Sequence, residues 1–359
     1  MFARPSWLTR AVPAAAAVVL VAGAAPATAS PADAGADAAD WLSTQLSTDA
    51  GGSFLETSYW DEWSTPPAVA SYADTGLTID GNWALLAAGL SAEADDTADW
   101  IRANASAYWN NGSCANSTGS VYAGSIAKLA VFEQANGGSA AGYISELECL
   151  QDSSGRIPNQ VDSSDPWDSD FSNTFTQSLA VVALSESSSV SAADAADYLV
   201  TQQCSSGAFR ATLGHTSTTC TSGVQDVDST AMAVQALAAA GEFTAAVNAV
   251  TWLETQQDTA GGYWESTACS TDSPPVPLPN TNSTALATQA QLAAGTDASD
   301  GQAWLEGRAG VDGRIPGCTA TNGGQPVQNS NDVRATTQAV PALLDVTLLD
   351  LASGALATP

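Results

Sequence analysis

The sequence predicts an all-α fold, an α/α toroid of about six helical hairpins whose loops are stapled by disulfides. Three recurring features indicate this fold. An aromatic residue followed by Leu or Ile recurs within Ala-rich segments, each segment runs into a glycine turn, and a polar capping residue then opens a second helix rich in small side chains. Because internal similarity of this kind is typical of repeat architectures, we interpret each pair of helices as one structural unit.

The first helix of each unit is marked by its aromatic pair. Successive pairs are separated by 59, 43, 55, 54 and 52 residues. The glycine that follows each of these helices supplies the left-handed conformation with which helices commonly end. The pairs are Trp41-Leu42, Trp100-Ile101, Tyr143-Ile144, Tyr198-Leu199, Trp252-Leu253 and Trp304-Leu305.

The second helix of each unit begins at Asp, Asn, Ser or Thr, the residues preferred as N-caps. The segment from Asp226 to Gly241 is the clearest example, and the segment that begins at Asn280 repeats its pattern. These helices carry small residues on every face, which is typical of a buried helix. We therefore expect them to form the inner wall of a ring, with the aromatic helices outside.

Closure of the units into a ring covers the apolar faces that an open solenoid, the alternative arrangement, leaves exposed at its ends. The ring predicts a single domain over residues 30–359, with a cavity whose mouth is lined by the N-terminal ends of the inner helices. The six repeats are placed near residues 37–91, 92–136, 137–187, 188–241, 242–295 and 296–350.

Residues 1–29 have the pattern of a secretory signal peptide. Arg4 and Arg10 precede an apolar run, and Ala27-Thr28-Ala29 provides the small residues of a cleavage site. A retained membrane anchor is the alternative, but it needs about 20 apolar residues. The sequence thus predicts a secreted protein that is cleaved near Ala29 and does not insert into a membrane.

The charge composition excludes several classes of partner. The chain has 38 acidic residues against 9 Lys and Arg, and its formal net charge is -29. Neutralising a nucleic-acid backbone requires several basic contacts, and anionic lipid surfaces repel such a protein. We therefore expect no nucleic-acid or membrane-surface partner.

The six cysteines favour disulfides over a zinc site. An even number of cysteines in an exported chain is typical of a disulfide framework, although six allow 15 connectivities. Zinc sites need closely spaced Cys pairs or partnering His, and the chain has one His. We therefore predict no metal site.

The repeat motifs resemble the prenyltransferase/squalene-oxidase repeat. The similarity lies in Tyr198 to Gln203, in Trp252 to Gln257 and in Asp226 to Leu237, and it extends over about residues 37–350. The superfamily includes protein prenyltransferases, triterpene and class II diterpene cyclases, and the helical domain of cobalamin carriers. In such a toroid the repeat loops share one mouth, which implies the pairings Cys204–Cys220, Cys114–Cys149 and Cys269–Cys318.

A class II cyclase-like enzyme is one function that the resemblance implies. The family's Asp-x-Asp-Asp motif corresponds here to Asp226-Val227-Asp228-Ser229, so Asp228 would be the general acid and Asp226 its neighbour. In the family motif the last carboxylate would help keep the acid protonated, and here Ser229 stands in its place. The alternative is that these residues only cap a helix, as Asn282 and Asn331 do in the sister repeats.

From the sequence we favour a secreted, non-catalytic protein that binds a ligand or acts as a scaffold. The most specific form of this prediction is a cobalamin carrier. Such a carrier would need a separate secreted β-domain protein or an uptake transporter as partner. Cobalamin would then be a ligand, and no other cofactor is expected. A protein prenyltransferase is rejected because one His and few scattered bases cannot build its zinc and diphosphate sites.

A glycoside hydrolase is a further alternative, since aromatic and acidic residues adjoin in two segments, Tyr59–Trp63 and Asp162–Asp170. Glycosidases need two carboxylates at a defined separation. Asp162, Asp165, Asp168 and Asp170 also offer a weak calcium site without the EF-hand spacing.

The loop tryptophans and the inner-helix caps are the candidate ligand contacts. Because loops and caps converge on one mouth, some of them should line a concave site for a large apolar or planar molecule. The loop residues are Trp60, Trp63, Trp83, Trp167 and Trp264, and the cap residues are Ser229, Asn282 and Asn331.

Overall fold

The computed structural model describes residues 30–356 apart from residues 111, 117–118, 166–167, 215–219, 264–278, 318–320, 323–324, 327 and 355. The predicted signal peptide, Trp167, Trp264 and the predicted Cys269–Cys318 bridge lie outside the described residues.

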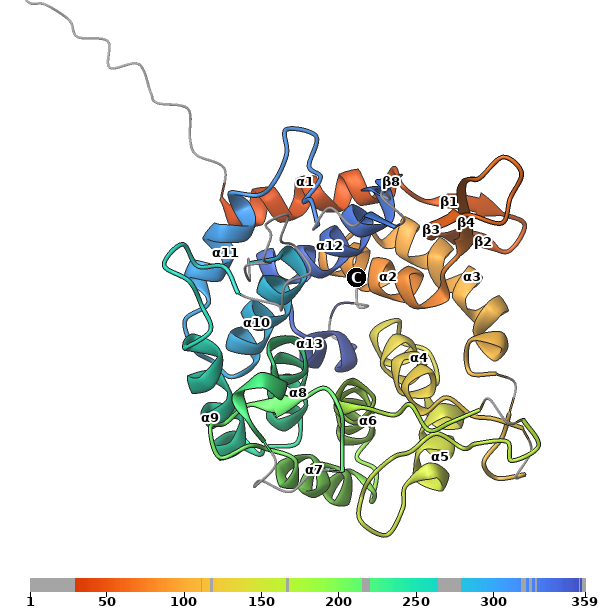
Figure 1. Ribbon diagram of the computed structural model, residues 1–359, viewed down its shortest axis with the longest axis vertical. Coiled ribbons are helices and arrows are strands. Elements are labelled where there is room, and N and C mark those ends of the chain that lie inside the picture. The colour runs from red at the N-terminus through yellow and green to blue at the C-terminus, as the bar shows by residue number, and fades with distance from the viewer. Residues whose placement is uncertain are drawn as a thin grey trace, which may run out of the picture.

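The helices form a closed double ring, which confirms the α/α toroid (Figure 1). Each inner helix packs against the next, and α12 packs against α2, so the inner ring is continuous. The outer helices are α1 (Pro31–Ser43), α3 (Ser91–Tyr108), α5 (Ala141–Leu150), α7 (Ala192–Thr201), α9 (Phe243–Glu254) and α11 (Ser299–Glu306). The inner helices are α2 (Thr75–Ala87), α4 (Ala123–Ala135), α6 (Thr174–Glu186), α8 (Val227–Ala239), α10 (Thr281–Ala293) and α12 (Gln328–Leu343).

A threonine joins four of the inner helices, α2, α8, α10 and α12, to the loop before them. Thr230 Oγ1 accepts a hydrogen bond from the buried amide of Phe209 at 2.8 Å, and Thr284 Oγ1 accepts one from Tyr263 at 2.9 Å. Thr78 and Thr336 accept equivalent bonds from Leu55 and Ile315. Because a buried amide without an acceptor is destabilising, this threonine has a structural role.

The glycines of five turns pack directly on the next outer helix. Gly207 has φ +97°, and a Cβ there would collide with the carbonyl oxygen of Asn248 in α9. Gly313 has φ +83°, and its Cβ would meet the carbonyl of Asp37 in α1 in the same way. The turn of the last unit therefore docks on the first helix of the chain and closes the ring.

Short two-stranded sheets occupy several loops, which the all-α prediction did not anticipate. In the first unit, β3 (Glu56–Asp61) and β4 (Ala68–Ala73) pair antiparallel, from Glu56 opposite Ala73 to Asp61 opposite Ala68. Exposed aromatic and β-branched residues, which favour extended structure, explain this hairpin. The other pairs are β1 (Ser47–Asp49) with β2 (Gly52–Phe54), β5 (Phe209–Arg210) with β6 (Gln225–Asp226), and β7 (Thr321–Asn322) with β8 (Gln325–Pro326); one 3-10 turn spans Ser222–Val224.

A short thirteenth helix, α13 (Leu348–Ala352), lies inside the ring (Figure 1). It contacts α4, α6, α8 and α10. Thr347 caps it in a reciprocal bond with Asp350, and the amide of Leu348 donates to Gln235 Oε1 at 2.9 Å. Since Gln235 is in the C-terminal half of α8, α13 closes the ring nearer the C-terminal ends of the inner helices and leaves their N-terminal ends as the mouth.

Two of the predicted disulfides are confirmed. Cys114 and Cys149 are bonded with a Cα–Cα distance of 5.9 Å, and Cys204 and Cys220 with one of 5.6 Å. The first joins the loop after α3 to α5, and the second closes a loop within one unit.

Among the described residues, no helix is long and apolar enough to span a bilayer.

Candidate functional site

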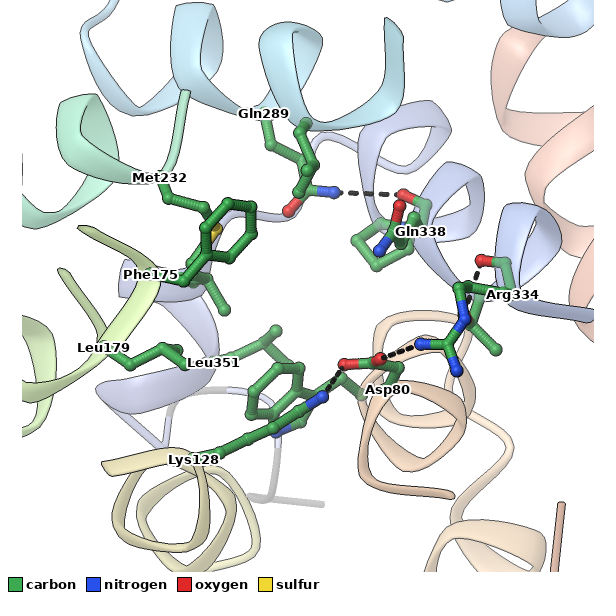
Figure 2. A pocket seen from close by; sticks show the side chains of 14 residues that line it. Asp80, Lys128, Phe175, Leu179, Met232, Gln289, Arg334, Gln338 and Leu351 are labelled. Atoms are coloured by element: carbon green, nitrogen blue, oxygen red, sulfur yellow. Dashed lines mark hydrogen bonds and ion pairs between the residues drawn. The ribbon is translucent and has the colours of Figure 1, made fainter. Parts of the chain in front are cut away.

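A cavity of ≈ 230 Å³ lies within the ring of inner helices (Figure 2). Five inner helices contribute the side chain of their sixth residue, which places these groups at one level, about two turns from the mouth. These residues are Asp80, Lys128, Leu179, Met232 and Leu286. The remaining lining residues are Trp83, Phe175, Gln289, Arg334, Thr337, Gln338, Pro341, Leu348 and Leu351.

One wall of the cavity carries charged groups. Lys128 Nζ lies 2.6 Å from Asp80 Oδ1 and donates to the carbonyl of Gly76 at 2.9 Å. Arg334 bridges Asp80, at 3.8 Å, and Asp74, at 3.3 Å. Burial acts to lower the pKa of Lys128, but the charge and hydrogen bond of Asp80 together with the nearby Tyr108 outweigh it, so the pKa lies above its ordinary value. Lys128 is therefore a charged ammonium at neutral pH.

The opposite wall is apolar. Phe175, Leu179 and Met232 line it from α6 and α8, and Leu351 of α13 lies beside them (Figure 2). Gln338 occupies the side toward α10, where its Oε1 accepts from Asn282 at 2.8 Å and its carbonyl accepts from Gln289 at 3.0 Å. The cavity thus presents distinct charged and apolar sides to anything that enters it.

The Asp-Val-Asp-Ser motif begins α8. Asp226 is the N-cap, and its Oδ1 accepts from the Ser229 amide at 2.7 Å. Asp228 is half-buried and lies one helical turn before Met232, on the mouth side of the cavity. Ser229 is fully buried and is not one of the residues that line the cavity. Asp226 therefore acts as the helix cap. Asp228 is not the N-cap and lies one turn before a residue that lines the cavity.

The predicted tryptophans that the structure describes divide into two groups. Trp60 lies in β3, and Trp63 follows at the end of the same hairpin, where its side chain is 88% exposed. The prediction that Trp83 belongs to a loop is wrong: it is the ninth residue of α2 and lines the cavity. An apolar inner-helix face toward the ring interior explains its position.

The prediction that Asn282 caps its helix is wrong, because the N-cap of α10 is Asn280, whose side chain accepts from the Ser283 amide. Asn282 lies in the first turn of α10, and Asn331 lies near the N-terminal end of α12. Asn282 donates a hydrogen bond to Gln338, which lines the cavity. Asn331 is half-buried, and its carbonyl lies close to Gly317. Neither residue lines the cavity.

The acidic loop of the third unit is tied together internally. Asp168 accepts from the Asp162 amide at 2.7 Å, and Asp170 pairs with Arg156 at 2.6 Å. Within the described part of the chain, no group of three or more His, Cys, Asp or Glu side chains is arranged to hold a metal ion. The other acidic-aromatic segment, in β3, belongs to a different unit of the ring.

Sequence reasoning missed the charged wall. The bases were interpreted as scattered, yet the ring brings Lys128 and Arg334 to one Asp80 from units two and six. The signal available in the sequence was that Lys128 is the only lysine and stands within a small-residue, buried helix.

Comparisons with known proteins agree on the fold. No protein-family model and no curated protein matches the chain. A solved structure of a variant of the type II terpene cyclase MstE from Scytonema, in complex with geranylgeranyl dihydroxybenzoate, is 16% identical with a TM-score of 0.60 and covers 89% of this chain and 98% of that one. An unsaturated glucuronyl hydrolase from Bacillus sp. GL1 is 12% identical with a TM-score of 0.56, and the match covers 87% of this chain and 94% of that one. A protein from Actinoplanes is 14% identical with a TM-score of 0.58 over 88% and 99%.

The class that the fold defines is therefore the α/α toroid, the architecture that this chain shares with a terpene cyclase and a glycoside hydrolase. At these identities the similarity establishes the fold alone.

Proposed function

We propose that the protein binds a small amphipathic molecule in the cavity of the ring. The observation that supports this most is the cavity itself, which is bounded on one side by Leu348 and Leu351 of α13 and has a charged and an apolar wall. Concave, mostly apolar sites with a few placed polar groups are the usual form of small-molecule sites.

Binding agrees better with the cavity than hydrolysis does. Among the described lining residues, Asp80 is the one carboxylate, and it is paired with Lys128 and Arg334. A glycosidase needs two carboxylates, one of them available as an acid. The cobalamin ligand and its β-domain or transporter partner stay predictions, and a volume of ≈ 230 Å³ favours a molecule smaller than cobalamin.

We further propose that the protein acts outside the cytoplasm. Two disulfides join its loops, and such bonds persist in oxidising compartments. The signal-peptide pattern of residues 1–29 supports the same location.

Filling the cavity tests the binding proposal. Leu179→Trp places a larger side chain at the level of the sixth inner-helix residue, and it should abolish the calorimetric binding of ten-carbon amphiphiles to the purified protein. Val190→Trp is the control, because Val190 is 93% exposed and lies outside the cavity. Equal binding by both variants, with both folded, would exclude the cavity as the site.

A cyclase-like activity is the second candidate, and the position of Asp228 one turn from the cavity wall favours it. A carboxylic acid at that place could protonate a prenyl double bond held below it. Incubation with geranylgeranyl dihydroxybenzoate, the compound bound by the MstE variant, tests this activity. Cyclic product that disappears in Asp228→Asn supports it, and product that persists in Asp228→Asn rules out the assigned acid.

A further inference from the structure

Two glutamine side chains of neighbouring inner helices line the cavity, Gln289 of α10 and Gln338 of α12 (Figure 2). Gln289 is buried, at 4% exposed, and its Nε2 donates to the main-chain carbonyl of Gln338 at 3.0 Å. Because a carbonyl can only accept, this bond fixes which end of the Gln289 amide is the nitrogen. Its Oε1 is then an acceptor that has no donor among the described residues.

The second amide presents the opposite end. Gln338 Oε1 accepts from Asn282 at 2.8 Å, and its Nε2 has no acceptor among the described residues. Both unpartnered atoms keep accessible surface, whereas Gln291 Oε1 on the same helix α10 is fully buried without a partner. The cavity wall therefore offers one acceptor and one donor to a molecule that enters it.

The charged wall of the cavity gives no preference for an ionic head group. Lys128 Nζ lies 2.6 Å from Asp80 Oδ1. Arg334 bridges Asp80 and Asp74, at 3.8 and 3.3 Å, so that two cations balance two carboxylates. The other described lining residues are uncharged. Since burying an ion without an opposite charge is costly, the cavity favours an uncharged head group.

We propose that the ligand carries a neutral head group that both donates and accepts hydrogen bonds, as an alcohol or a primary amide does. Its donor binds Gln289 Oε1, and its acceptor binds Gln338 Nε2. Its apolar body lies against Leu179, Met232 and Leu351 (Figure 2). A carboxylate has no hydrogen to donate to Gln289, and an ammonium has no lone pair to accept from Gln338. This inference rests on the proposed function and adds the chemical class of the ligand.

The test compares four ligands with the same ten-carbon chain: 1-decanol, its methyl ether 1-methoxydecane, decanoate and decylamine. Calorimetric titration of the intact protein at pH 7.5 should give the tightest binding for decanol, by about tenfold over each of the others. The ether accepts but cannot donate, and the two remaining ligands are ions. An ether or an ion that binds as tightly as decanol would overturn the neutral head group. Absence of binding by all four would overturn the proposed function itself.

Gln289→Met keeps the length of the side chain and removes its polar atoms. The variant should bind decanol about tenfold more weakly, with a smaller loss for the ether. Gln291→Met is the matched control, since Gln291 is 3% exposed and also belongs to α10 but does not line the cavity. Unchanged decanol affinity in folded Gln289→Met, or an equal loss in both variants, would remove Gln289 from the head-group site.

Discussion

Lys128 is the only lysine of the chain, and it is buried in the cavity wall against Asp80. Its charge is retained because the carboxylate compensates for the loss of water around the ammonium. Tyr108 and Arg334 also face it, and the hydroxyl of Tyr108 has a raised pKa because it is buried.

Removing this ammonium should destabilise the fold. Lys128→Met leaves the buried Asp80 with Arg334 alone, at 3.8 Å, and should lower the free energy of unfolding by about 3 kcal/mol in urea titrations. The double variant Lys128→Met, Asp80→Leu should recover most of the loss, because no buried carboxylate remains without its partner. A double variant as unstable as the single one would contradict this explanation.

The same ion pair predicts an alkaline pH dependence. The pKa of Lys128 is raised in the folded protein, so its contribution is complete below the unfolded-state pKa of about 10.4 and is lost as the pH rises through the folded-state value. The stability difference between wild type and Lys128→Met should therefore shrink above about pH 10.4. A constant difference up to pH 12 would show that the pKa is not raised.

At the level of elements, the residues of the repeat motif bind backbone groups and so have a structural role, not a catalytic one. Thr230 accepts the amide after the glycine turn, and Gln203 Nε2 donates to the carbonyls of Gly207 and Ala245. These contacts recur in several units, so periodicity in the sequence predicts the helices and their inner and outer places, and the resemblance to known toroids predicts the two disulfides.

The cavity could not be predicted in the same way. The charged wall is made of residues from three different units, Asp80, Lys128 and Arg334. Only closure of the ring brings these side chains together. Trp83 was placed in a loop because one aromatic residue does not define a helix face. The helix α13 is five residues long and has no counterpart among the described residues of the other units, so a search for repeats does not detect it.

At the level of the whole molecule, the ring is closed by the contact between the Gly313 turn of the sixth unit and α1. Gly313→Ala and Gly241→Ala both place a side chain at positive φ, +83° and +79° respectively, which costs about 1–2 kcal/mol. Only Gly313 also faces a backbone carbonyl, that of Asp37, whereas nothing lies within 4 Å of a Cβ at Gly241.

Gly313→Ala should therefore be less stable than Gly241→Ala by about 1–3 kcal/mol in urea unfolding, because its methyl group forces the ring apart where it closes. Equal losses in the two variants would mean that the closure between the last unit and α1 tolerates displacement.

The most direct test of the ligand site is a crystal structure of the protein grown with 1-decanol. We predict electron density for the chain between Leu179, Met232 and Leu351, inside the ring of inner helices. Decanol bound only outside the ring, for example along the exposed aromatic residues of the β3–β4 hairpin, would contradict the assignment of the cavity as the functional site.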